Sequence, residues 1–382
     1  MSNKSILFIS LLKGASWGGS EQLWYKTALY AAQNGYQVSC AIFDLKGKED
    51  KLDVLRQAGC TIVLLPFSEK KRQFFKKLYY KLFSKHVTNY KLNKVVNDLK
   101  KHYYDYIVIN QSGFMDIVND PWNDIDFKCK VSSLVYHNYI EKYVFSTSKA
   151  DKMRKRLNAV SHNLFAANHM HHVLSKQLNF SIPNSELIYN PIAFESKYSD
   201  LAVSENESLK MIMLAALISS TKSQDCLITV LSSEKWKKRD WILEFYGNGP
   251  DKEQLEKMIA KAELGNKVFL RGFTKDVQEV INNAHVLLQI TRQDAMPIAV
   301  IEAMAVGRPI IASRIGDMPK WVLENENGWI AEDTSYDEID RVLELLWLNK
   351  MNLQKMGKRS FELFESKFPQ NVEQRFLDQI TN

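Results

Sequence analysis

The chain has 382 residues, enough for two domains that each bury a full core. Apolar residues make up 45% and charged residues 25%, the balance of a globular protein, and no apolar run approaches the ~20 residues of a membrane span. The net charge is +7, but the stretch 70–101 alone carries eleven Lys or Arg against one acid. A charge so localised argues against a general nucleic-acid coat and indicates one cationic surface.

The first half of the chain alternates apolar strand patterns with helical ones. Strands are predicted at 6–12, 37–43, 61–65, 106–110 and 131–136, with helices at 23–34 and 52–58. This order predicts an α/β fold with a doubly wound parallel sheet. Gly18 and Gly19 lie in the first strand-to-helix loop, where glycines let a backbone approach a ligand closely.

His137 follows the strand 131–136 directly, at the edge where parallel sheets bind their ligands. Taken alone, a histidine at such a position is more often structural than functional. His169, His171 and His172 have no acids at metal-ligand spacing, and the four cysteines lack Cys-x-x-Cys spacing. We therefore expect no metal site, and free thiols in a reducing, cytoplasmic compartment.

The basic stretch contains an amphipathic pattern over 74–83. Its aromatic and leucine residues share one side of a helical wheel, and lysines occupy the other. Such a helix suits the surface of an anionic membrane, here the inner face of the plasma membrane. The same pattern is equally typical of a domain helix with an aromatic core side and solvated lysines.

The second half repeats the alternation after a polar run at 196–209, which is part of a linker or a surface loop. Strands are predicted at 211–217, 241–246, 268–273, 286–290 and 310–313, a hairpin-like piece at 328–330, and helices at 336–347 and 354–368. A second parallel-sheet domain is expected here, with no internal sequence repeat.

The segment 286–309 is the most informative part of the chain. It predicts a short buried strand, a polar loop, and a helix that Pro297 opens and Gly307 ends. Such a unit presents unpaired backbone N–H groups and the positive end of a helix dipole, which together favour phosphate. Two carboxylates frame it, Asp294 in the loop and Glu302 in the helix.

At these residues the chain resembles the retaining GT-B glycosyltransferases of family 4, also called group 1. Their signature is S-x-x-E-G-x-P followed by E-A-M-A-x-G-x-P, and Glu302 to Pro309 match its second half closely. The first half departs from it, with Asp294 for the first Glu and Ala295 for the Gly. The loop that ends in Gly18-Gly19-Ser20-Glu21 resembles the family's G-G-x-E, and Asn190-Pro191 resembles its interdomain N-P.

The resemblance implies a GT-B architecture, two Rossmann-like doubly wound parallel-sheet domains facing a central cleft. The expected domains are an acceptor-binding domain over 1–190, a nucleotide-sugar-binding domain over 191–360, and a C-terminal helix over 361–382 that packs back on the first domain.

The resemblance also implies roles for particular residues. His137 would orient the donor sugar, Asp294 would hold its hydroxyls, and Lys222 would bind the donor pyrophosphate. Glu302 would accept the ribose hydroxyls. The donor-binding set is completed by Gly18, Gly19, Gly272, Phe273, Ala295 and Met296. Leu217 stands where the family has an arginine, so either Arg292, Arg271 or a shifted side chain supplies the second cation, or the donor is held more weakly.

The implied activity is transfer of a sugar from a nucleotide diphosphate sugar, UDP- or GDP-linked, to a glycan or lipid-linked acceptor in bacterial surface polysaccharide synthesis. It would retain the anomeric configuration and need neither metal nor cofactor. Two alternatives remain open: a nucleotide-sugar epimerase, and a non-catalytic relative that serves as a membrane-surface assembly partner. A dinucleotide oxidoreductase is disfavoured because the first loop lacks G-x-G-x-x-G.

Overall fold

The computed structural model of the chain describes residues 4–13, 17–44, 46–67, 90–111, 113–119, 121–122, 127–204 and 206–382. Its contacts divide the chain into two compact units, Met1–Pro191 with Gln370–Asn382, and Ile192–Pro369. The amphipathic pattern over 74–83 lies outside the described residues, and of the basic stretch the structure describes a helix over 90–101.

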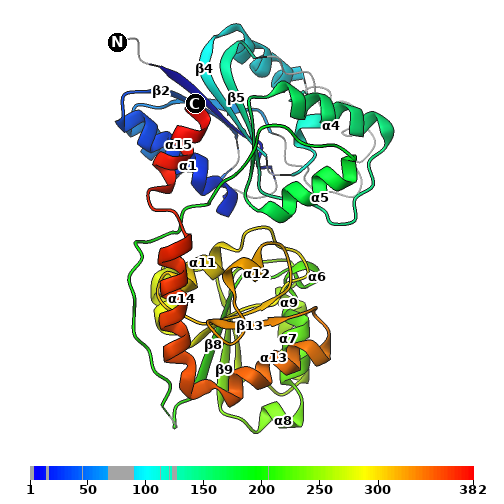
Figure 1. The fold of residues 1–382 in the computed structure, drawn as a ribbon, viewed down its shortest axis with the longest axis vertical. Coiled ribbons are helices and arrows are strands. Elements are labelled where there is room, and N and C mark those ends of the chain that lie inside the picture. The colour runs from blue at the N-terminus through cyan, green and yellow to red at the C-terminus, as the bar shows by residue number, and fades with distance from the viewer. Residues whose placement is uncertain are drawn as a thin grey trace. The chain divides into compact units, whose positions relative to one another are not determined.

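The first unit is built on a sheet of seven parallel strands in the order β3-β2-β1-β4-β5-β6-β7 (Figure 1). The strands are β1 (Ser5–Ser10), β2 (Gln37–Phe43), β3 (Thr61–Leu65), β4 (Tyr104–Asn110), β5 (Cys129–Tyr136), β6 (His162–Phe165) and β7 (Ser185–Leu187). The chain adds strands first on one side of β1 and then on the other. The β1/β4 boundary is therefore the switch point at which such sheets bind ligands.

Helices of the first unit include the last helix of the chain. The unit contains α1 (Gly19–Gln33), α2 (Glu49–Gln57), the helix over 90–101, the short η1 (Asp116–Val118), α4 (Thr147–Ala159), α5 (Asn168–Leu178) and α15 (Val372–Thr381). The helix α15 packs against α1, with Phe376, Leu377 and Ile380 buried. Its apolar stripe therefore completes the core of the first unit.

The second unit has a sheet of six parallel strands in the order β10-β9-β8-β11-β12-β13. They are β8 (Leu209–Leu214), β9 (Trp241–Tyr246), β10 (Val268–Gly272), β11 (Val286–Gln289), β12 (Ile310–Ser313) and β13 (Gly328–Ala331). The expected hairpin-like piece at 328–330 is wrong: β13 pairs parallel to β12, because the helix α12 (Met318–Trp321) carries the chain back before the strand begins. Here the switch point lies between β8 and β11.

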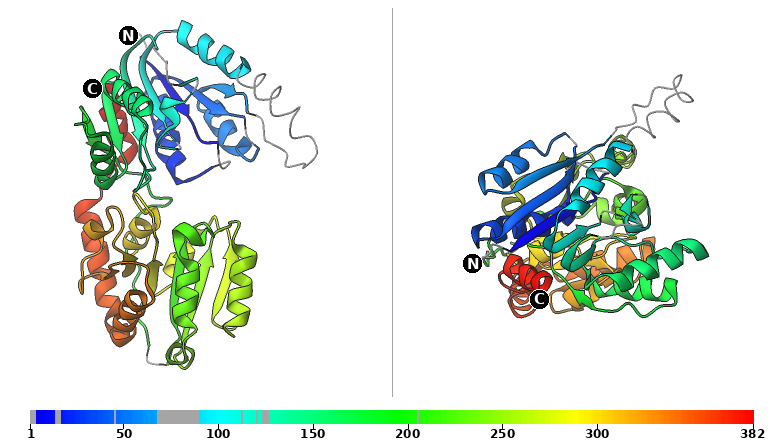
Figure 2. Two further views of the ribbon diagram at one scale, coloured as in Figure 1. Left: turned by 90° about the vertical axis from the view of Figure 1, so that its right-hand side faces the viewer. Right: turned by 90° about the horizontal axis from the view of Figure 1, so that it is seen from above.

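Helices of the second unit connect these strands. They are α6 (Ser219–Lys222), α7 (Gln224–Leu231), α8 (Glu234–Lys237), α9 (Lys252–Lys261), α10 (Val277–Asn282), α11 (Ile298–Met304), α12, α13 (Tyr336–Leu348), η3 (Lys350–Asn352) and α14 (Leu353–Lys367). The helix α7 packs with α9 and α13, whereas α11 packs with α10 and α14 (Figure 2). Within the described ranges, no helix is long and apolar enough to cross a membrane.

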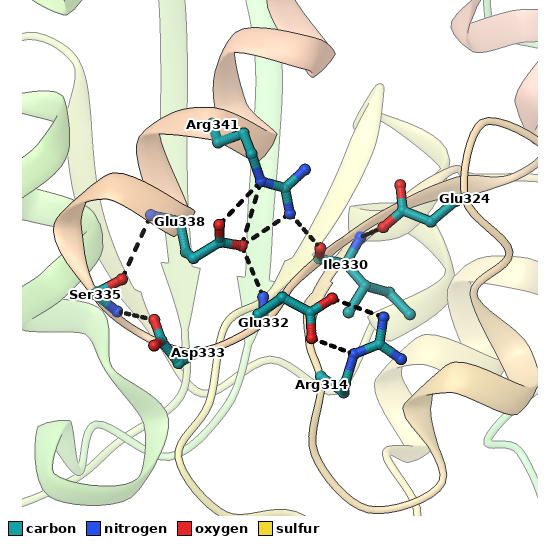
Figure 3. Close-up of polar contacts among 8 residues, drawn as sticks. All are labelled: Arg314, Glu324, Ile330, Glu332, Asp333, Ser335, Glu338 and Arg341. Atoms are coloured by element: carbon teal, nitrogen blue, oxygen red, sulfur yellow. Dashed lines mark hydrogen bonds and ion pairs between the residues drawn. The ribbon is translucent and has the colours of Figure 1, made fainter.

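An ionic network ties the last strand to α13 (Figure 3). Arg314, just after β12, donates two hydrogen bonds of 2.6 and 2.8 Å to Glu332, just after β13. Arg341 of α13 donates to the carbonyl of Ile330 at 2.8 Å and pairs with Glu338. Because Arg314 and Glu332 both follow strand ends, these contacts join the carboxyl ends of the last two strands of the sheet.

Candidate functional site

In the second unit, hydrogen bonds join the loop after β8 to the loop after β11 at the switch point. The carbonyl oxygen of Thr221 accepts a hydrogen bond of 2.7 Å from the Thr291 hydroxyl and another of 2.7 Å from the Arg292 N–H. Thr291 is itself buried, and its N–H donates to the Ser313 hydroxyl at 2.9 Å. The short helix α6 is thereby held over the predicted polar loop.

These hydrogen bonds bring together two predicted site residues that are far apart in the chain. The Lys222 Nζ lies 2.7 Å from Asp294 Oδ2, and both side chains are mostly buried, 22% and 15% exposed. The Gln289 amide donates to the same oxygen at 3.0 Å, and the N–H of Ala295 donates to Oδ1 at 3.0 Å. The acid is thus held at both oxygens, with a lysine ammonium as its counter-ion.

The two arginines that could replace the missing family arginine are engaged elsewhere. Arg292 donates to the Ser219 carbonyl at 2.6 Å and to Cys226 Sγ at 2.9 Å. Arg271 donates to Glu244 at 2.7 Å. Leu217, in the loop after β8, is buried in the apolar core of the unit. Lys222 is therefore the predicted cation that the loops place at this edge.

The second acid, Glu302, lies in the second turn of α11. Pro297 is the N-cap of that helix and not its first residue, so the helix begins one position later than expected. Glu302 is 6% exposed, and its Oε1 accepts a hydrogen bond of 3.0 Å from the N–H of Ala193. Sequence reasoning missed this contact with the linker that follows Pro191, since nothing in the pattern shows which carboxylate oxygen the backbone occupies.

Some backbone N–H groups beside Asp294 donate no hydrogen bond to the described residues. The N–H groups of Met296 and Ile298 have no acceptor among the described residues, whereas that of Ala295 is taken by Asp294. Gly316 holds this loop in place at a φ of +57°, where a Cβ would lie 2.6 Å from the Asp294 carbonyl oxygen. Gly272 ends β10, and the Phe273 ring that follows is 70% exposed.

In the first unit, the carboxyl ends of β1, β4 and β5 bring polar side chains together. Ser10 ends β1, Asn110 ends β4, and His137 follows β5. Gly18 is the N-cap of α1 and Gly19 its first residue, which places Glu21 of that helix against the strand ends. Glu21 is fully buried and accepts from the Ser10 hydroxyl at 2.6 Å and from the Asn110 amide at 3.0 Å.

His137 joins this network through its ring nitrogen. The His137 Nε2 lies 2.8 Å from Asn110 Oδ1, and burial lowers the pKa of the imidazole to about 4. Lys48 is 1% exposed beside Glu21, and burial lowers its pKa although the Glu21 carboxylate opposes the shift. The roles of Glu21, Asn110 and Lys48 were missed, but Asn110 ends a predicted strand next to the one that His137 follows, which was a signal that could have found it.

Among the residues that the structure describes, no group of three or more His, Cys, Asp or Glu side chains is arranged to hold a metal ion. His169, His171 and His172 stand near the start of α5, and His169 pairs with Glu141 at 2.9 Å.

Comparison with known proteins identifies the second unit. Residues 200–362 match the family model of the glycosyl transferases group 1. We call this matched part of the chain the group 1 domain. It contains Lys222, Asp294 and Glu302, the loops that hold them, and the helices α6 to α13.

Curated relatives of the chain are also glycosyltransferases. An uncharacterized glycosyltransferase of Haemophilus influenzae is 29% identical over 185 residues, 48% of this chain and 51% of that protein. The poly(ribitol-phosphate) alpha-N-acetylglucosaminyltransferase of Staphylococcus aureus is 31% identical over 130 residues, 33% of this chain and 26% of that protein. The chain thus spans about half the length of the first relative and about a quarter of the second.

Solved structures share the fold of the whole chain. The Anabaena protein HepE in complex with UDP-glucose superposes with a TM-score of 0.71 at 15% identity, covering 99% of each chain. With two parallel-sheet Rossmann-like units, of which the second contains the group 1 domain, the chain has the GT-B fold.

Proposed function

We propose that the chain is a glycosyltransferase that moves a sugar from a nucleotide diphosphate sugar to an acceptor hydroxyl. The observation that carries the proposal is the Lys222–Asp294 pair at the switch point of the group 1 domain, next to the unused N–H groups of Met296 and Ile298. A cation and backbone donors at one edge suit the diphosphate of the donor, and a carboxylate beside them suits sugar hydroxyls. The solved HepE complex contains UDP-glucose, which supports a UDP-linked donor.

The proposed reaction requires the site to stabilise a departing nucleoside diphosphate. The bond between the anomeric carbon and the diphosphate oxygen breaks, and the acceptor oxygen bonds to that carbon while its proton passes to the leaving diphosphate. Lys222 would neutralise the charge that develops on the diphosphate, and the N–H groups of Met296 and Ile298 would add hydrogen bonds. Glu302, whose carboxylate also accepts from the N–H of Ala193, would hold the ribose hydroxyls.

We further propose retention of configuration and membership of family 4. Support comes from the signature that resembles that family and from the environment of the two acids. Asp294 accepts hydrogen bonds at both oxygens, and Glu302 is buried against the linker, so neither is arranged as a covalent nucleophile. Front-face transfer assisted by the departing diphosphate accounts for retention without a covalent intermediate. Charge neutralisation by Lys222 would replace a divalent ion.

A non-catalytic relative is the second candidate, and Leu217 favours it. The family arginine is absent there, and Arg292 and Arg271 are bound to protein groups. Such a protein would bind a nucleotide sugar weakly or not at all.

A thermal-shift panel of UDP-, GDP-, ADP- and dTDP-sugars, with EDTA in half the wells, tests the proposal. Stabilisation by one nucleotide sugar, unchanged by EDTA, followed by release of the nucleoside diphosphate when acceptor is added, is the expected result. Absence of any shift at millimolar ligand would favour the non-catalytic relative. Conversion of the donor without an acceptor would indicate an epimerase.

For the acceptor, we propose a glycan or lipid-linked glycan of bacterial surface polysaccharide synthesis, reached at the inner face of the membrane. The poly(ribitol-phosphate) enzyme of S. aureus, whose name states transfer to such a polymer, supports the class. The helix over 90–101 exposes Lys91, Lys94 and Lys101 and buries Leu92, Val96 and Leu99, which is compatible with a cationic surface. Co-sedimentation with anionic but not neutral vesicles would support membrane contact, and equal binding to both would contradict it.

A further inference from the structure

We propose that Asn110 is a positioning residue that fixes His137 in its neutral Nε2–H form and leaves the Nδ1 lone pair to accept a hydrogen bond from a ligand hydroxyl. Asn110 ends β4, His137 follows β5, and Glu21 in the first turn of α1 lies against both strand ends. The network therefore stands at the switch point of the first unit's sheet.

The orientation of the Asn110 amide decides the tautomer. Its Nδ2 is 3.2 Å from the carbonyl oxygen of Ser20, which can only accept, and 3.0 Å from Glu21 Oε1. The Nδ2 group must therefore face α1, which turns Oδ1 toward His137. Since Oδ1 can only accept, the His137 Nε2 at 2.8 Å must be the donor.

The other ring nitrogen is left without a protein partner. The His137 Nδ1 is buried and has no hydrogen-bond partner in the part of the chain that the structure describes. With Nε2 protonated in the neutral ring, Nδ1 can act as an acceptor. A second proton there would leave a buried N–H unsatisfied, in agreement with the lowered pKa of His137. A hydroxyl group of the ligand is the donor that fits. That this ligand is a sugar rests on the proposed function, but the tautomer does not.

Glu21 keeps the amide in this orientation. It accepts from the Ser10 hydroxyl at 2.6 Å as well as from Asn110, so its carboxyl group is fixed from two strands. Burial raises the pKa of Glu21, and Lys48 is the charged group that opposes the shift. Glu21→Gln keeps an oxygen that can accept from Asn110, whereas Glu21→Leu removes it. The conservative variant should therefore preserve the state of His137.

Nuclear magnetic resonance of the full chain with isotope-labelled histidine tests the inference directly. The His137 signal is assigned by its loss in His137→Gln. The wild type should show a neutral His137 with a protonated Nε2 whose hydrogen exchanges slowly. Asn110→Leu should abolish that protection, and Asn163→Leu should not. Asn163 is a matched control, because its amide is also buried and donates to two carbonyls, of Leu157 and Pro183, without touching His137.

The wild-type spectrum alone can overturn the inference, whatever the variants do to folding. A neutral His137 protonated on Nδ1, or an imidazolium at neutral pH, would refute it. So would an Nε2 hydrogen that stays protected in folded Asn110→Leu.

An activity measurement separates this inference from the proposed function. Loss of one hydrogen bond to a buried ring corresponds to about a tenfold lower kcat/KM in Asn110→Leu, with Glu21→Gln near wild type. If no nucleotide sugar is turned over but the spectrum is as expected, the proposed function fails and the role of Asn110 stands. If transfer occurs with His137 in the other tautomer, the role of Asn110 fails and the function stands.

Discussion

Replacing Lys222 with methionine probes the charge that the donor diphosphate would meet. Methionine keeps the length of the side chain and removes the ammonium that lies 2.7 Å from Asp294. The variant should keep the contact between the two loops, because Thr221 and Thr291 join them by a hydrogen bond that does not involve Lys222. Because the mostly buried Asp294 carboxylate loses its counter-ion, the free energy of unfolding should fall by about 1–3 kcal/mol.

The expected loss of activity follows from electrostatics. A lysine about 4 Å from one unit of diphosphate charge contributes about 4 kcal/mol at an effective dielectric constant of about 20. Part of this is offset, because Lys222 must exchange Asp294 for the diphosphate. A net contribution of about 1.4 to 2.7 kcal/mol corresponds to a kcat about 10- to 100-fold lower.

The assay is the initial rate of nucleoside diphosphate release with a saturating donor. Lys257→Met is the matched control: Lys257 pairs with Glu253 at the same 2.7 Å, but its side chain is 74% exposed on α9. The control should keep wild-type activity. A kcat for Lys222→Met within twofold of wild type, with the protein folded, would refute the assignment and show that another cation meets the diphosphate.

Three further perturbations test other parts of the account. Glu302→Ala should raise the donor KM at least tenfold, because it removes the buried carboxylate that is proposed to hold the ribose. An unchanged KM in a donor titration would reject that role. Gly316→Ala places a Cβ 2.6 Å from the Asp294 carbonyl oxygen. The free energy of unfolding, measured by denaturant titration, should therefore fall by about 1–3 kcal/mol. In the control Gly265→Ala the new Cβ meets open space, and the free energy of unfolding should hardly change. The pKa of His137 is lowered from 6.5 to about 4, so the unfolded chain binds a proton that the native chain does not. This difference should lower the free energy of unfolding by about 2–3 kcal/mol as the pH drops from 6.5 to 4. The free energy of unfolding should therefore fall less steeply with pH in His137→Asn than in His172→Asn. Equal pH dependence in the two variants would show that His137 does not link protonation to stability.

Much of the architecture could be predicted from the sequence because hydrophobic periodicity reports which elements are buried. The alternation of strands and helices gave both parallel sheets, and the strand ends placed His137 and Asp294 at ligand edges. The direction of β13 could not be inferred, since a short buried strand after a turn has the same pattern whether its neighbour runs parallel or antiparallel.

The pairing of side chains was the part that the sequence could not supply. Arg292 is one residue from Thr291 in the predicted loop, yet its guanidinium turns to the Ser219 carbonyl and Cys226. Leu217 occupies the position of a family arginine, but it packs in the core, so restoring an arginine there would bury a charge and not extend it toward a ligand. Such outcomes depend on contacts between segments far apart in the chain, which periodicity does not encode.

The role of the signature residues as functional groups stays a prediction, as do the domain limits of 1–190, 191–360 and 361–382. The structure brings Lys222 to Asp294 and buries Glu302 against the linker, and the comparisons identify the domain that contains them.

The most direct test of the central claim is to follow the fate of the anomeric carbon. The full chain is incubated with the nucleotide sugar that stabilises it and a panel of glycan and lipid-linked acceptors, and the product is examined by nuclear magnetic resonance. The account predicts acceptor-dependent release of nucleoside diphosphate and a new glycosidic bond with the anomeric configuration of the donor. A product of inverted configuration would contradict the retaining mechanism, and no transfer with any donor and acceptor would contradict the proposed function.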